Sequence, residues 1–98
     1  MKNIFGIEEP NEGEIVDSLF NHKNIKIERI ISSDKIPDKE YIQEQDEWVV
    51  LLKGKATLET GGNTHELREG DYLFIPSGQW HKVLKTQSGT VWLAVHIF

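Results

Sequence analysis

The sequence predicts an all-β protein, a sandwich or barrel of short strands preceded by one short helix. Segments rich in β-branched residues fill most of the chain from residue 25 to residue 98. Turn signals separate these segments at intervals of about 8 to 12 residues, which is typical of sandwiches and barrels. Helical periodicity occurs in only one place.

The one helical pattern lies near the N-terminus, after Pro10. Four apolar residues recur there at the spacing of a single helix face. They are Ile15, Val16, Leu19 and Phe20. We therefore expect a short amphipathic helix over residues 12–21 that lies across one face of a sheet, with the barrel over residues 25–98.

The strands are predicted by alternation and by turn residues. Ile25–Ile31 begins in strict alternation and is rich in β-branched residues, which favour a pleated surface. Trp48–Leu52 is continuously apolar, as in a strand buried on both faces. Thr60–Asn63 encloses two glycines that can take the positive φ angles of a tight hairpin turn. The other expected strands are 56–60, 64–67, 72–75, 81–85 and 91–98.

Length and charge limit the range of functions. The 98 residues are expected to form one domain, 1–98, because single domains typically hold about 100 to 150 residues. A chain of this size buries a modest core, so we predict a homodimer in which a second subunit covers apolar surface. The net charge is −5 and the chain has no basic run, which argues against nucleic acid as a partner.

The chain contains no cysteine, which excludes a disulfide framework, a thiolate zinc site and a cysteine nucleophile. Its first residues lead into Glu8 and Glu9 without an apolar stretch of signal-peptide length, and no span approaches the length of a membrane crossing. We therefore expect a cytoplasmic protein with no membrane partner.

Two segments carry recognisable motifs. In the run from Gly70 to His81, glycine, proline, glycine and histidine occupy positions 70, 76, 78 and 81, a spacing that resembles the second motif of the cupins. The segment Glu47–Gly54, in which an acidic residue precedes a glycine by seven positions, resembles the end of their first motif. Asp46–Gly54 and Trp92–His96 together look like small bacterial cupins that are known chiefly as uncharacterised proteins.

The resemblance implies the cupin double-stranded β-helix, an RmlC-like jelly-roll barrel with a metal site in its interior. In the family, two histidines and an acidic residue of the first motif, with one histidine of the second, hold one ion. This set suits Fe, Mn, Ni, Cu or Zn and leaves positions open for substrate, and no organic cofactor is implied. The acidic position falls on Glu47 and the second-motif histidine on His81, whereas Tyr41 and Gln43 replace the two missing histidines.

The replaced positions keep the geometry of a site but change its donors. If the strand has no bulge, Tyr41, Gln43, Gln45 and Glu47 share one parity and point to one face. Gln43 offers a carbonyl oxygen, which is a weak ligand, and Tyr41 must lose its proton before it can bind a metal. We expect metal affinity to be well below that of the full set.

The histidines leave further alternatives open. His81 is either a metal ligand or an interior histidine hydrogen-bonded to Glu47. His96 is an additional ligand if it faces the cavity, but both faces of its expected strand are apolar, so its direction stays open. His65 and His22 are expected to be solvated.

Two hypotheses about function follow, because the cupin fold by itself does not select one. The first is a metal-dependent enzyme that acts on a small polar molecule. Its ion would be held by Glu47 and His81 and completed by Gln43 or His96, and Tyr41 would donate a proton or bind substrate.

The second hypothesis is a metal-free module that binds or senses a sugar or carboxylate. Tyr41, Gln43 and Trp80 would then contact the ligand, Trp80 by stacking, although core or dimer packing is an alternative role for each tryptophan. A metal-free sugar isomerase that uses His81 and Tyr41 as an acid-base pair ranks third.

Overall fold

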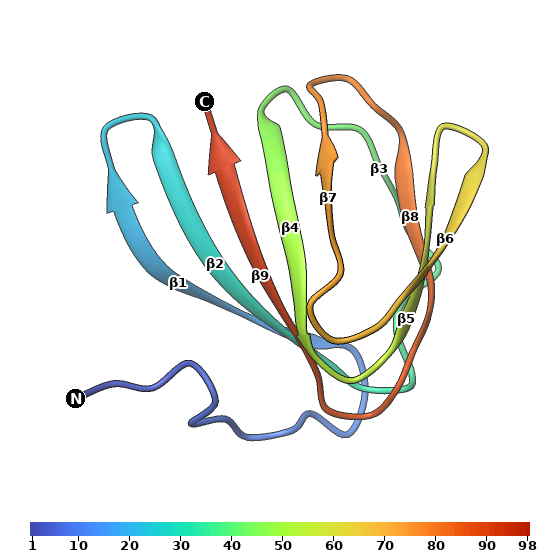
Figure 1. Cartoon of the computed structure of the whole chain (residues 1–98). Helices are drawn as coiled ribbons and strands as arrows, with labels where there is room; N and C mark the ends of the chain where they lie inside the picture. The colour runs from blue at the N-terminus through green and yellow to red at the C-terminus, as the bar shows by residue number, and fades with distance from the viewer.

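The computed structural model describes all residues, 1–98, as nine strands without a helix. Figure 1 shows two sheets that converge at one end and diverge at the other. The strands of the larger sheet, in spatial order, are β1 (Glu14–His22), β2 (Ile25–Ser32), β9 (Thr90–Ile97), β4 (Asp46–Lys53) and β7 (Tyr72–Ile75). Those of the smaller sheet are β3 (Glu40–Tyr41), β8 (His81–Thr86), β5 (Ala56–Thr60) and β6 (Asn63–Leu67). No helix that could cross a membrane is present.

The predicted helix over residues 12–21 is wrong, because these residues form the edge strand β1. Its pairing with β2 shifts register between Ser18 and Phe20, which leaves Leu19 as an extra residue in a β-bulge. Before the bulge, outward positions fall on odd numbers such as Ile15, and after it they fall on even numbers such as Phe20. The break in alternation produced the spacing that resembles a helix face.

Most other predicted elements are confirmed. The strands β5 and β7 have the predicted bounds, and β2, β4, β6, β8 and β9 differ from prediction by one or two residues at one or both ends. The hairpin turn between β5 and β6 is also confirmed, because Gly61 and Gly62 adopt φ angles of 50° and 90°.

The prediction that Trp48–Leu52 is buried on both faces is wrong. Val49 and Leu51 face the other sheet and are buried, whereas Trp48, Val50 and Leu52 lie on the outer face and are half-buried. The reason is that the outer face of the larger sheet has no second layer of structure over β4 (Figure 1). The hydrophobic core therefore lies between the two sheets, where Leu51, Leu58, Ile75 and Trp92 pack together, among others.

A chain of hydrogen bonds joins the core to the edge strand. The indole Nε1 of Trp92 donates to Ser32 Oγ at 3.0 Å, and Ser32 Oγ donates to Glu14 Oε2 at 2.7 Å. Ser32 is fully buried, and Glu14 lies opposite it in the β1–β2 pairing. These bonds hold the Glu14 carboxylate on the inner side of the sheet.

Two turn glycines have similar backbone angles but differ in the space around them. Gly54 and Gly70 adopt nearly equal φ angles of 92° and 91°, but a Cβ on Gly54 would lie 2.5 Å from Thr90 Oγ1, whereas one on Gly70 would meet nothing within 4 Å. Thr90 is buried and its hydroxyl is within hydrogen-bonding distance of the Lys55 and Gln87 carbonyls, so it cannot move freely.

We expect Gly70→Ala to lower the free energy of unfolding by about 1 kcal/mol through backbone strain alone. Gly54→Ala should cost roughly 1–3 kcal/mol more, because overpacking is added to the same strain. Urea denaturation of both variants and wild type measures the difference. Equal losses in the two variants would show that Thr90 yields without cost.

Candidate functional site

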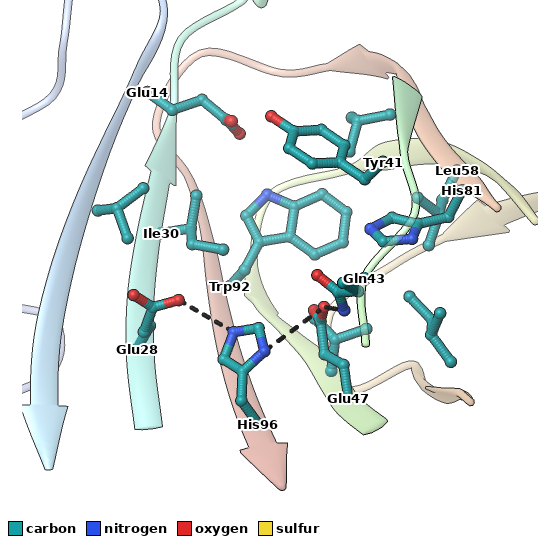
Figure 2. Close-up of a pocket in the computed structure, with 14 residues that line it drawn as sticks. Glu14, Glu28, Ile30, Tyr41, Gln43, Glu47, Leu58, His81, Trp92 and His96 are labelled. Atoms are coloured by element: carbon teal, nitrogen blue, oxygen red, sulfur yellow. Dashed lines mark hydrogen bonds and ion pairs between the residues drawn. The ribbon is translucent and has the colours of Figure 1, made fainter. Parts of the chain in front are cut away.

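A cavity of about 200 Å³ lies between the inner faces of the two sheets. Figure 2 shows its lining, to which both sheets contribute. Half of the lining residues carry side chains that can form hydrogen bonds or exchange protons: Glu14, Glu28, Tyr41, Gln43, Glu47, His81 and His96. The remainder is apolar: Val16, Ile30, Val49, Leu58, Ile75, Val83 and Trp92.

The structure brings most of the predicted site residues together. Tyr41, Gln43, Glu47, His81 and His96 all line this cavity. Tyr41, Gln43 and Glu47 thus line one cavity, but the predicted parity along one strand is not the reason: Tyr41 lies on β3, Glu47 lies on β4 of the other sheet, and residues 42–45 between them are not in a strand. Gln45, which has the same parity, does not line the cavity, whereas His96, whose direction the sequence left open, does. Trp80 does not line the cavity, and the tryptophan that does is Trp92.

Strand register places the central pair of side chains. Glu47 on β4 lies directly opposite His96 on β9, and both side chains point inward with about 7% of their surface exposed. Gln43 donates from Nε2 to Glu47 Oε1 at 2.5 Å. The side chain that donates a hydrogen bond to the buried Glu47 carboxylate is thus the neutral amide of Gln43.

Both ring nitrogens of His96 face protein side chains. Nδ1 is 3.2 Å from Gln45 Nε2 and 3.9 Å from Glu47 Oε1. Nε2 is 2.9 Å from Glu28 Oε1, but this contact is not aligned as a hydrogen bond, so Nε2 is a buried polar atom without a hydrogen-bond partner. Figure 2 shows the ring held between the two carboxylates.

Tyr41 and His81 form the opposite wall. They are paired across β3 and β8, and their rings stack with centroids 5.4 Å apart and an angle of 16° between planes. His81 Nδ1 is 3.5 Å from the Gln79 carbonyl oxygen. The alternative prediction of a His81–Glu47 hydrogen bond is not met, because the contacts of Glu47 are Gln43 and His96.

The cavity is acidic. Three carboxylates line it, and no lysine or arginine does. The pKa of Tyr41 is raised above 10.0, first by burial and second by the negative charge of Glu14. Figure 2 shows the Tyr41 hydroxyl and the Glu14 carboxylate pointing toward one another. At neutral pH the Tyr41 hydroxyl is therefore protonated.

The predicted metal set does not fit this geometry. No three histidine, aspartate, glutamate or cysteine side chains lie close enough together to hold one ion. Glu47 and His96 are adjacent, but both nitrogens of His96 already face Gln45 and Glu28. A transition metal needs access to a lone pair on each imidazole ligand, and Gln45 and Glu28 occupy the positions in front of the two nitrogens of His96.

Sequence reasoning missed Glu14 and Glu28. Glu14 was missed because its strand was taken for a helix. Glu28 was missed because Ile25 and Ile27 alternate with polar residues, which normally indicates that the polar side faces solvent. The available signal was Ile30, which shares parity with Glu28 and lines the cavity. His65, predicted to be solvated, is half-buried and within hydrogen-bonding distance of Thr60 at 2.8 Å.

The titration of Tyr41 tests the electrostatics of the cavity. In a Tyr72→Phe background, Tyr41 is the only tyrosine, and its ultraviolet absorbance should titrate above pH 10.0. Because the folded-state pKa is raised, folding favours the protonated phenol, and stability should fall as pH rises past the unfolded value of about 10. Adding Glu14→Gln should lower the midpoint only partly, since burial is the larger cause. A midpoint at or below 10 would contradict this assignment.

Comparisons with known proteins agree with this architecture. The family model described as "Cupin domain" matches residues 33–96. A crystal structure of a candidate mannose-6-phosphate isomerase from Ralstonia eutropha JMP134 is 38% identical, with a TM-score of 0.90 over 99% of this chain and 96% of that one. A cupin superfamily protein from Desulfitobacterium hafniense DCB-2 has a TM-score of 0.82 over 94% of this chain and 84% of that one, and at 17% identity it shows the fold alone.

An uncharacterised protein from Aquifex aeolicus (strain VF5) is 37% identical over 65 residues, or 66% of this chain. The match spans about half, 52%, of that relative's length. The family model covers well over half of the chain described here, and the fold, the two motifs and the Ralstonia structure agree with it. The chain belongs to the cupin family.

Proposed function

We propose that this cupin binds a small organic molecule directly through its own side chains and acts as a metal-independent binding or sensing module. The observation that carries the proposal is the arrangement of Glu47 and His96. Glu47 accepts from Gln43, and both nitrogens of His96 face Gln45 and Glu28. The polar groups of the cavity are thus organised by one another rather than around one point where an ion could sit.

The size and lining of the cavity support a small ligand. Its volume of about 200 Å³ lies below the range of roughly 300–1,000 Å³ that is typical of pockets for drug-sized ligands, so only a small molecule fits. Half of the lining residues present aliphatic or indole surface, and the polar groups are few. This combination is typical of sites that bind small organic molecules.

The name of the Ralstonia relative does not transfer readily to this chain. A phosphorylated sugar carries negative charge, and sites that bind phosphate usually present arginine, lysine or backbone N–H groups. The cavity is lined by three carboxylates and by no basic side chain of those two kinds. The proposed ligand is therefore not a sugar phosphate.

The stacked pair of Tyr41 and His81 favours one further candidate function, a metal-free enzyme that transfers a proton. The raised pKa of Tyr41 keeps its hydroxyl protonated and able to act as an acid. His81 stacks on its ring in the same cavity and could act as the base. Tyr41 remains our candidate catalytic residue for this second function.

We also propose that the chain forms a homodimer through the outer face of the larger sheet. The strand register places apolar side chains in rows across that face. One row contains Phe20, Ile27, Val95, Trp48 and Phe74, and the next contains Leu93, Val50 and Tyr72.

The exposure of these rows supports a second copy of the chain as the partner that covers this face. Phe20, Phe74 and Tyr72 are each at least half exposed in the single chain, and contiguous apolar patches of this kind mark association sites. Two such faces can pack across a two-fold axis as sheets do in a sandwich, about 10 Å apart. Each face would then cover the apolar rows of the other.

The metal-independent proposal predicts that wild-type protein, purified without tag or chelator and then loaded with Fe, Mn, Ni, Cu or Zn, retains far less than one ion per chain by elemental analysis. It also predicts that at least one organic compound in a small-molecule library raises the melting temperature, because a ligand that binds only the folded state stabilises it. His22→Ala, which removes an exposed histidine, is the control for His81→Ala. One tightly bound ion per chain that His81→Ala removes and His22→Ala keeps would refute the proposal.

The dimer proposal predicts that Phe74→Lys, at a residue that is 55% exposed in the single chain, converts the protein to a monomer. The cause is that an ammonium group cannot be buried in an apolar interface without a partner. Leu84→Lys is the matched control, because Leu84 is 43% exposed on the other sheet. Sedimentation velocity measures both. A wild-type monomer at high micromolar concentration, or a dimeric Phe74→Lys variant, would rule out this interface.

A further inference from the structure

Two carboxylates in the cavity, Glu47 and Glu14, have no lysine or arginine as a partner, and the imidazole of His96 approaches Glu47 only to 3.9 Å. Glu47 accepts a hydrogen bond from the neutral amide of Gln43, and Glu14 accepts one from the hydroxyl of Ser32. Glu28 differs, because Lys26 Nζ lies 3.4 Å from Glu28 Oε2. Removing a carboxylate from water is costly unless an opposite charge accompanies it.

A second observation also points to a missing partner. His96 is about 93% buried, since 7% of its surface is exposed, and its Nε2 atom has no aligned hydrogen bond within the protein. The atom lies beside Glu28 in the wall of the same cavity. Buried polar groups are nearly always satisfied, so this nitrogen, which faces Glu28 at 2.9 Å without an aligned hydrogen bond, shows that the protein alone does not fully satisfy the polar wall of the cavity.

We propose that the ligand of this cavity is a small organic cation, a protonated amine that carries a short hydrocarbon group. The inference rests on the proposed binding function and names its ligand class. The ammonium group supplies the positive charge that Glu47 and Glu14 lack, and the hydrocarbon group lies on the aliphatic part of the lining.

The hydrogen-bonding groups in the cavity match an ammonium donor. Because Nε2 of Gln43 donates to Glu47, the amide oxygen of Gln43 is the end that remains available to accept. Figure 2 shows this oxygen directed toward the cavity. Tyr41 contributes a hydroxyl that makes no hydrogen bond within the protein and points toward Glu14. An ammonium group has three donors and no acceptor, so it matches the acceptor oxygens of the hydrogen-bonded pair Gln43 and Glu47.

The same groups reject anions. An incoming carboxylate or phosphate would meet Glu14, Glu28 and Glu47 and would find no lysine or arginine in the lining. Like charges in a partly desolvated site repel strongly, which gives specificity as well as affinity. The effect of Glu14 on the pKa of Tyr41 has the same origin, a negative potential inside the cavity.

The experiment compares n-butylamine, 1-butanol and butyrate, which share a four-carbon chain and carry positive, zero and negative charge at pH 7. Affinity for the metal-free full-length protein is measured by NMR titration at fixed ionic strength, with the amides of lining residues as reporters. We expect n-butylamine to bind at least tenfold more tightly than 1-butanol, and butyrate not to bind.

Charge-removing variants localise the effect. Glu47→Gln keeps the shape of the side chain and should weaken n-butylamine at least tenfold while leaving 1-butanol unchanged. Glu44→Gln removes the same charge from an exposed position outside the cavity and should change neither affinity. If Glu47→Gln fails to fold, Glu14→Gln replaces it with the same expected direction.

The outcomes separate the ligand class from the binding function. If 1-butanol or butyrate binds as tightly as n-butylamine, or if n-butylamine does not bind at tens of millimolar while a neutral or anionic library compound does, the cation assignment is overturned and the binding function stands. If no organic compound binds and one metal ion does, both are overturned. An unchanged amine affinity in Glu47→Gln and Glu14→Gln would likewise overturn the proposed site.

Discussion

The site depends on the register between β4 and β9. This pairing sets Glu47 opposite His96 and, two residues on, Val49 opposite Ala94. Side chains alternate between the two faces of a strand, so a slip of one residue would move the polar pair to the outer face and bring Trp48 or Val50 inward. The apolar neighbours Val49, Leu51 and Ala94, all buried, fix the register. The β4–β9 register that packs the core therefore also places the polar side chains in the cavity.

The edge strand is tied to this core by polar contacts more than by apolar ones. The side chains of β1 are mostly exposed, but the bonds from Trp92 to Ser32 and from Ser32 to Glu14 connect β9, β2 and β1. The pair Arg29–Asp17, at 2.7 Å, joins β1 to β2 on the outer face. Glu14 thus belongs to the cavity because a buried hydroxyl holds it there.

Much of the fold could be predicted from the sequence, because strands and turns are determined locally. The alternation in β2, the glycines between β5 and β6 and the motif spacing each have a physical cause within a few residues. The edge strand could not be predicted in this way, because the bulge at Leu19 is a property of its pairing with β2. The parity argument for Tyr41, Gln43 and Glu47 assumed one continuous strand, whereas the chain crosses from β3 in one sheet to β4 in the other between Tyr41 and Glu47. The direction of His96 depends on which face of β9 meets the other sheet. Trp80 lies before β8, so strand alternation could not show that it is outside the cavity.

The replacement of two family histidine positions by Tyr41 and Gln43 has an electrostatic consequence. In the cupin pattern that the motifs resemble, an ion supplies the positive charge beside the acidic residue. Here Glu47 remains at that position and remains buried, while Gln43 satisfies one of its oxygens without neutralising it. Positive charge nearby stabilises a buried carboxylate whatever its source, and this holds for Glu47 after the ion-binding residues have changed. A cationic ligand would supply that stabilisation with the residues that are present.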